Sequence, residues 1–438
     1  PEGLFDGSAG GRKEVVFRIG GGLNVVPVDR FFQDFYYPGL LSAIWRGERP
    51  LPEVRLGESL PPKLKIVSPG EGGIIETPQV TLEIEAVDQG GGISGLELFI
   101  NNQKILTAGE SRQDKNSIFR TFEDVLLIEG ENHIEVRAAS ADGSWQSEPA
   151  RILFRYEKPL PKPKLYLVTV GINQYADPSL NLQFAVNDAN AMNKLFEIEG
   201  PKLYEQVNST ILLDKSATRS RIVSEIRKVA NLAKAQDTVI VFLAGHSAVL
   251  GKQYFFLPHE FKNHSSLREE NIRESGLLAD SLGEELSRIP ALKRILIFDT
   301  GRSKLKFNST SRNPFALRSA VEKLVHANGG FTLAAATTTD NSHEVSVLKQ
   351  GVLTYSLLSG LHATNTGPLT NEWIKTSDKN NVADVLEWFS YANLHVPQLT
   401  RQYFGTEQNI HFSSAGYSFP VLPVLVSKNS HTKQQPSL

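Results

Sequence analysis

The sequence contains no cysteine among its 438 residues. This absence excludes disulfide bonds, thiolate metal sites and a cysteine nucleophile. It does not identify a cellular compartment, because proteins of oxidising and of reducing compartments can both lack cysteine. The chain also lacks an excess of charge of either sign, since its formal net charge is -2. It therefore has no overall attraction for nucleic acid or anionic lipid.

Long apolar runs are missing as well, since none approaches the roughly 18 residues that a membrane-spanning helix needs. From the near-neutral charge we expect no nucleic-acid partner, and from the missing apolar runs we expect no membrane partner. We favour a cytoplasmic location. The chain begins with Pro1 instead of methionine, so we expect a fragment or a processed form. Its length predicts about two to four domains.

The residues that are present change in character along the chain. Residues 1–62 are rich first in glycine and then in aromatic residues and proline, and we interpret them as an N-terminal connector. Residues 63–156 alternate apolar and polar side chains over short runs, as in Val80–Ala86. This period is typical of half-buried strands, and turn residues such as Asp142 and Gly143 separate the runs. The segment predicts an all-β sandwich of immunoglobulin-like type.

A different pattern follows a proline-spaced linker at residues 157–163, and it extends over residues 164–426. Continuous apolar runs predict the central strands of one largely parallel sheet at 165–172, 239–244, 294–298 and 331–336. Helical spacing predicts covering helices over 182–196, 218–235, 279–288 and 353–361. The predicted fold class is multidomain, an α/β domain preceded by an all-β sandwich. The polar residues 427–438 predict a disordered tail.

Two of the predicted strands lead into residues that can carry chemistry. One apolar run leads to His246, and a second, about 55 residues later, leads to Asp299, Thr300 and Gly301. Parallel strands present their carboxyl ends at one edge of a sheet, where α/β folds place their sites. We therefore expect His246 and Gly301 to face each other at this edge.

These motifs occur in an order that resembles bacterial caspase-like and metacaspase-like proteins of peptidase family C14, in clan CD. The segments that carry the resemblance are Val170–Tyr175, Ala185–Ala189, Phe242–His246, Tyr254–His259, Ile297–Thr300 and Leu353–Leu358. The histidine of caspases also lies about 50 residues before the nucleophile. Residues 1–36 resemble the connector that follows WD40 propellers in bacterial WD40–caspase proteins. The resemblance implies a caspase-like domain over residues 164–426.

The family's chemistry implies a histidine that accepts a proton and a cysteine thiolate that attacks the scissile carbonyl. His246 matches this histidine, although Ser247 follows it where the family usually has glycine. The family pattern Asp-x-Cys-x-Ser-Gly aligns with Asp299 to Lys304, so Gly301 stands at the position of the nucleophile. We therefore expect the chain as given to be inactive as a peptidase.

The resemblance also implies an acidic pocket that binds a Lys or Arg side chain, lined by Asp188 and Asp299. Two carboxylates suit such a side chain, because they give charge-assisted hydrogen bonds to its cation. An alternative is that Asp188 is a structural carboxylate near the start of a helix. The sequence leaves both interpretations of Asp188 open.

Other polar residues favour structural roles. Ser247 and Ser303 are poor replacement nucleophiles, because an alcohol needs a well-aligned base and neither serine is at the matched position. His259, Glu260 and His264 lack the spacing of a helical metal motif, and we interpret them as solvated loop residues. We expect no metal and no cofactor.

The sequence thus predicts a caspase-like pseudoprotease, a binding, scaffold or regulatory module whose partner is a protein or peptide with a Lys or Arg side chain. One alternative is a Lys/Arg-directed cysteine endopeptidase whose nucleophile was removed in this chain. Another is a structural interaction module of a larger WD40-containing protein. The sequence leaves the oligomeric state open.

Overall fold

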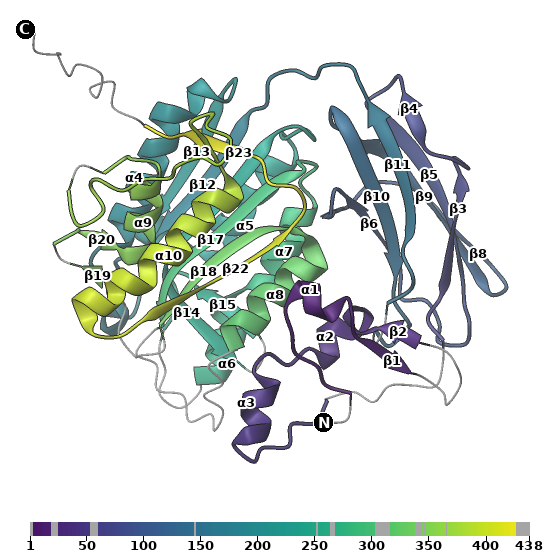
Figure 1. Cartoon of the computed structure of the whole chain (residues 1–438), viewed down its shortest axis with the longest axis horizontal. Coiled ribbons are helices and arrows are strands. Elements are labelled where there is room, and N and C mark those ends of the chain that lie inside the picture. Colours follow the sequence, from purple (N-terminus) through teal and green to yellow (C-terminus); the bar gives the residue numbers. More distant parts are fainter. Residues whose placement is uncertain are drawn as a thin grey trace, which may run out of the picture.

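The structure is a computed structural model, and the residues that it describes are 3–18, 25–52, 60–143, 146–250, 253–262, 268–302, 316–337, 344–345, 347–364 and 366–425. Figure 1 shows a β-sandwich beside a larger α/β unit, with the N-terminal elements packed at one end. The predicted tail at 427–438, Ser303 and His264 lie outside the described residues.

The N-terminal part is held by an aromatic cluster, formed by Phe31, Phe32, Phe35 and Tyr36 together with Phe5. The elements around it are α1 (Ala9–Arg12), β1 (Val16–Arg18), β2 (Val25–Pro27), the 3-10 helix η1 (Val28–Phe31), α2 (Phe32–Phe35) and α3 (Leu40–Trp45). The helix in this aromatic stretch is short and begins as a 3-10 turn.

The sandwich consists of two sheets with the strand orders β3-β5-β9-β8 and β4-β11-β10-β6-β7. Their strands are β3 (Lys63–Ser68), β4 (Gly73–Ile75), β5 (Gln79–Val87), β6 (Leu96–Ile100), β7 (Gln103–Ile105), β8 (Ser111–Asp114), β9 (Ser117–Leu126), β10 (Gly130–Ala138) and β11 (Ala150–Tyr156). Every second residue of β5 is buried, namely Leu82, Ile84 and Ala86. This alternation confirms the predicted immunoglobulin-like sandwich, because one face of each sheet forms the core.

The α/β unit is built on one sheet, whose strand order among the described residues is β13-β12-β14-β17-β18-β22. Its strands are β12 (Leu165–Gly171), β13 (Val207–Leu213), β14 (Thr238–Leu250), β17 (Lys293–Arg302), β18 (Gly330–Thr337) and β22 (Gln408–Ala415), with β15 (Gln253–Leu257) and β16 (Leu277–Leu278) attached to β14. The strands from β13 to β18 are parallel, whereas β22 is antiparallel. The predicted parallel sheet is confirmed.

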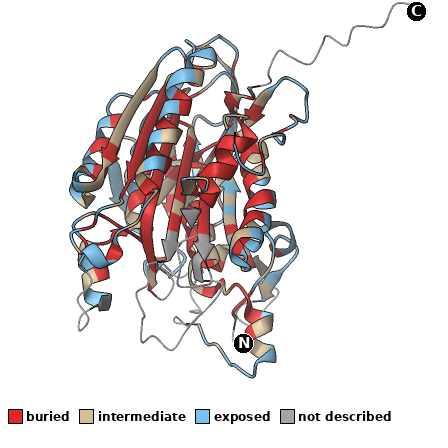
Figure 2. Cartoon of the chain, turned by 90° about the vertical axis from the view of Figure 1, so that its left-hand side faces the viewer, coloured by how far each residue is buried: buried red, intermediate tan, exposed pale blue. Residues whose placement is uncertain are grey.

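Helices cover both faces of this sheet. On one face lie α4 (Ala185–Glu199), α9 (Val352–Gly360) and α10 (Val385–Phe404). The other face is covered by α5 (Arg219–Ala230), α7 (Ala279–Ser287) and α8 (Ala316–Asn328), and α6 (Arg268–Ser275) packs near β15. Figure 2 shows how completely the strands between them are buried. Strands that are buried on both faces read as continuous apolar runs, which is why the sequence pattern identified them.

The remaining elements are short, and they connect the larger ones. They are the 3-10 helices η2 (Pro178–Leu180), η3 (Gly200–Lys202) and η4 (Asp214–Ser216), and the strand pairs β19 (Glu344–Val345) with β20 (Gln350–Gly351) and β21 (Val382–Asp384) with β23 (Pro420–Pro423). Among the described residues, no helix is long and apolar enough to cross a membrane.

Several predicted boundaries were wrong. The helix predicted from residue 182 begins at Ala185. The Asn173 side chain donates to the Gln183 carbonyl and accepts the N–H of Val186, so it fixes the start of the helix. The helix predicted to reach Ala235 ends at Ala230, since Asp237 accepts the N–H of Lys234 and turns the chain toward β14. The strand predicted to end near residue 244 continues to Leu250 as part of β14.

The sandwich is joined to the sheet through a buried arginine at the amino end of β17. Arg294 donates hydrogen bonds to the Gln103 side chain at 3.0 Å and to the Lys104 carbonyl at 2.9 Å, both in β7 of the sandwich. It also donates to the carbonyls of Leu286 and Asn328 in the α/β unit. Burial lowers the pKa of Arg294 to about 9. The contact lies on the same strand that carries Asp299 and Gly301 at its other end.

Candidate active site

His246 lies where β14 changes partners. Up to Ser247 the strand pairs in parallel with β17, and from His246 onward it also pairs antiparallel with β15. The His246 side chain is buried, and its Nε2 hydrogen-bonds the carbonyl of Leu180 at 2.8 Å. The Tyr175 hydroxyl accepts the His246 N–H at 2.8 Å. The loop after β12, which carries both partners, therefore fixes the backbone and the ring of this histidine.

Gly245 makes this arrangement possible. Its φ is +158°, and a Cβ there would lie 2.7 Å from the Tyr175 hydroxyl oxygen. That oxygen is the one that accepts the His246 N–H. A side chain at position 245 would therefore displace Tyr175, so glycine is required for close approach at this point.

Gly301 is the direct partner of His246 in the β14–β17 ladder, as Ala244 is of Asp299. Side chains two residues apart in a strand share a face. Ala244 belongs to the core beneath α4 and α9, and Asp299 contacts α9. His246 follows Ala244 by two residues in β14, and Gly301 follows Asp299 by two residues in β17. Positions 246, 299 and 301 therefore lie on the face of the sheet that α4 and α9 cover. The predicted juxtaposition of His246 and Gly301 is confirmed.

Asp188 and Asp299 converge on the N-terminus of α9. The Asp188 Oδ1 atom accepts the N–H of Gly351 at 2.9 Å, and the Asp299 Oδ2 atom accepts the N–H of Thr354 at 3.0 Å. A methyl group on Gly351 would lie 2.8 Å from Asp299 Oδ2 and 3.1 Å from Asp188 Oδ2. The two carboxylates, from α4 and β17, thus face one point beside Gly351.

The N-terminus of α9 offsets part of the electrostatic repulsion between the Asp188 and Asp299 carboxylates. The amino end of a helix carries partial positive charge and unpaired N–H groups. Asp188, 3% exposed, and Asp299 both accept N–H groups at this end of α9, and Asn187 holds the preceding segment by donating to the Lys349 carbonyl at 3.1 Å. The acidic pair is therefore a fixed part of the fold as well as a candidate site for a cation.

The opposite face of the sheet edge carries a hydroxyl cluster. The Tyr254 and Thr300 hydroxyls lie 2.6 Å apart, and Ser247 lies beside Tyr254. Burial raises the pKa of Tyr254 to about 12. The neighbour of Ser247 is thus a neutral phenol, which is a poor general base. This arrangement gives no support to Ser247 as a nucleophile.

His259 and Glu260 take structural roles. The His259 Nδ1 atom hydrogen-bonds the Gln174 carbonyl at 2.6 Å, and Glu260 accepts the N–H of Arg219 at 2.9 Å, where α5 begins. The part of the chain that the structure describes contains no group of three or more His, Cys, Asp or Glu side chains that could hold a metal ion.

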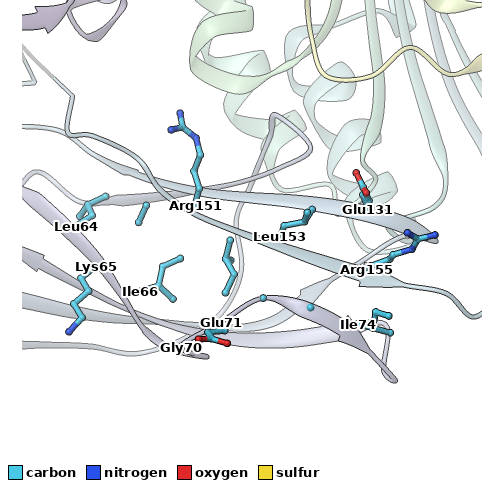
Figure 3. Close-up of a pocket in the computed structure, with 14 residues that line it drawn as sticks. Leu64, Lys65, Ile66, Gly70, Glu71, Ile74, Glu131, Arg151, Leu153 and Arg155 are labelled. Atoms are coloured by element: carbon cyan, nitrogen blue, oxygen red, sulfur yellow. The ribbon is translucent and has the colours of Figure 1, made fainter.

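A separate cavity of about 830 Å³ lies on the sandwich, between the edges of its two sheets. Figure 3 shows Leu64, Ile66 and Leu153 across it, with Lys65, Glu71 and Arg151 among the polar residues around them. Its lining includes none of the four candidate site residues, which lie in the α/β unit.

The sequence did not identify the residues that hold the site in place. Tyr175 and Leu180 position His246, and Gly351 and Thr354 engage the two aspartates. Tyr175 lies within a motif that the resemblance included. Thr354 lies in another such motif, but neither pattern indicated these contacts.

Comparison with known proteins identifies two regions of the chain. Residues 165–414 match the caspase domain family, and residues 62–136 match a bacterial Ig domain family. None of the curated proteins compared with the chain matches it significantly.

Among solved structures, protein GSU0716 from Geobacter sulfurreducens is 15% identical, with a TM-score of 0.37, over 58% of this chain and 94% of its own. The endo-β-1,4-mannanase from Thermotoga petrophila is 10% identical (TM-score 0.19; 28% of this chain, 26% of its own). CopC from Methylosinus trichosporium OB3b is 16% identical (TM-score 0.18; 23% of this chain, 99% of its own). These structural similarities are too low to indicate a function. The caspase match, in contrast, covers more than half of the sequence, and the chain therefore belongs to the caspase family, with a bacterial Ig domain before the caspase domain.

Proposed function

We propose that this chain is a pseudoprotease of the caspase family, a binding or regulatory module that has no peptidase activity. The observation that carries the proposal is the direct pairing of His246 with Gly301 at the edge of the sheet. A thiolate attached there would lie beside the histidine, but glycine has no side chain that can attack a carbonyl.

The proposed ligand is a Lys or Arg side chain of a partner protein or peptide, bound by Asp188 and Asp299. Their carboxylates face a common point, and their contacts with α9 hold them before a ligand arrives. An ion pair in a partly solvated pocket contributes about 1 kcal/mol, and a desolvated, charge-assisted one contributes more. Tight binding therefore requires further contacts between the partner and this face of the sheet.

Titration of an Arg-containing peptide tests this proposal. The variant is the double substitution Asp188→Asn, Asp299→Asn, because asparagine keeps an oxygen that can accept the N–H groups of Gly351 and Thr354. The matched control removes two charges from exposed positions, as Glu129→Gln, Glu205→Gln. We expect several-fold weaker binding only in the aspartate variant. Equal affinity of all three proteins would mean that the aspartates serve the fold alone.

A second candidate is an interaction module of a larger, WD40-containing protein. The tight attachment of the sandwich through Arg294 favours it, because such an interface presents the two domains to a partner as one unit. A partner that binds the wild type and the Asp188→Asn, Asp299→Asn variant equally, and binds neither domain alone, would support this candidate.

A further inference from the structure

A second cavity, of about 860 Å³, opens against α10, and none of its lining residues belongs to the candidate active site. One wall is the segment 371–377, which follows α9 in the chain. The other wall consists of side chains from α10, among them Tyr391 and His395. The capping box of Asp384 and Glu387 fixes the start of this helix, so the second wall is rigid.

Two aromatic rings line the cavity and are held by their neighbours. The Trp373 ring stacks on the ring of His362, with centroids 4.3 Å apart. The Tyr391 hydroxyl donates to the Glu372 carbonyl at 2.9 Å, and the Tyr391 ring packs 4.2 Å from that of His395. Fixed aromatic faces attract cations, because the ring faces carry negative potential.

The charge of Glu372 is not balanced by a Lys or Arg side chain among the residues that the structure describes. Its side chain is 62% exposed, and its ion-pair contact among the described residues is with His395 Nε2, at 3.8 Å. Burial lowers the pKa of His395 despite the opposing effect of Glu372, so the imidazole is neutral near pH 7. Lys375 also lines the cavity, yet it forms no ion pair with Glu372 in the described part of the chain.

A buried imidazole and a second carboxylate lie beside Glu372. His395 is 6% exposed, and its Nδ1 atom is buried without a hydrogen-bond partner among the described residues. The Glu387 carboxylate also lines the cavity, where it accepts the N–H of Ser377 at 2.6 Å, and it adds a second negative charge. The cavity thus combines aromatic walls with net negative charge.

We propose that this cavity binds the ammonium or guanidinium group of a Lys or Arg side chain in a partner peptide, with Glu372 as the counter-charge. The rings of Trp373 and Tyr391 pack against the cation and its aliphatic stem. This site is separate from the acidic pair of Asp188 and Asp299, and it does not depend on the function proposed for them.

Binding of small probes tests the assignment. Nα-acetyl-lysine methylamide and Nα-acetyl-arginine methylamide carry the cation on a peptide unit, n-butylamine carries an ammonium without one, and the norleucine analogue carries no charge. Each is titrated into the wild type and into Glu372→Gln, Tyr391→Ala and Glu205→Gln, and into Asp299→Asn, which reports on binding at the acidic pair. The exposed Glu205→Gln is the matched loss of one charge. Glu372→Gln alters an exposed side chain, so it tests the site even where Tyr391→Ala disturbs folding.

We expect saturable binding of at least one cationic peptide probe, weakened about two- to five-fold by Glu372→Gln and by Tyr391→Ala, as exposed ion-pair and cation–π contacts predict. Glu205→Gln should leave it unchanged. Equal affinity for the norleucine analogue, or for Glu372→Gln and wild type, overturns the proposal. Equal affinity for n-butylamine overturns the assignment to a peptide. Loss of binding in Asp299→Asn alone would place the probe in the acidic pair instead.

Discussion

Acid should loosen the contact between α8 and the N-terminal segment through His326. The His326 ring stacks on Phe32 with centroids 4.4 Å apart, and its Nδ1 atom is buried without a partner among the described residues. Burial lowers the pKa of His326 to about 3, and the positive charges of Arg137, Arg12 and Lys323 act in the same direction. The folded protein therefore resists protonation of this histidine.

The magnitude follows from proton linkage. In the unfolded chain His326 has an ordinary pKa of about 6.5, so it is neutral in both states above that value and contributes no pH dependence there. As the pH falls from 6.5 toward 3, the unfolded chain gains a proton that the folded protein does not, and stability is lost. Between pH 7 and pH 5 the loss is about 2 kcal/mol.

Urea unfolding at pH 7 and pH 5 measures the effect in the wild type and in His326→Phe. Phenylalanine keeps a ring against Phe32 but cannot be protonated. The wild type should lose about 2 kcal/mol more stability than the variant between the two pH values. His133→Gln, at an exposed histidine, should behave as the wild type. If His326→Phe and the wild type lose equal stability, His326 is not the acid-sensitive group.

Other substitutions test the packing around the site. Gly351→Ala should destabilise the protein by about 1–3 kcal/mol, because the added methyl group meets Asp188 and Asp299. Gly70→Ala is the control, because a methyl group there lies in open space and should leave stability unchanged. Equal urea unfolding curves of the two variants would contradict this prediction. Arg294→Met should lower the free energy of unfolding by about 3 kcal/mol or more, because it leaves buried carbonyls of two domains unpaired. Arg288→Met, at an exposed arginine, is its control. An Arg294→Met protein as stable as the control in urea would show that the buried contact is dispensable.

The sheet and the pairing of His246 with Gly301 could be predicted from local sequence. Strands buried on both faces leave continuous apolar runs, and parallel order then aligns their carboxyl ends. The extension of β14 beyond His246 was not predictable in this way, because β15 supplies its pairing partner. α10 was also missed, since Pro397 lies inside it, and proline usually ends a helix.

The contacts of the acidic pair were beyond the reach of the sequence. Gly351 and Asp188 are 163 residues apart in the chain, and only the packing of α9 against α4 brings them together. No local pattern marks a backbone N–H as the partner of a carboxylate so far away. Without that contact, Asp188 could be assigned equally to ligand binding and to the fold.

The central claim, that Gly301 stands at the nucleophile position beside His246, is tested most directly by alkylation of a Gly301→Cys variant with a chloromethyl ketone that carries a basic side chain. The account predicts that Cys at this position reacts faster than Cys in Glu205→Cys, an exposed control, and that His246→Ala removes the difference. The wild type should cleave no Lys- or Arg-containing peptide in parallel assays. Labelling no faster than at the control position, or wild-type cleavage that His246→Ala abolishes, would contradict the account.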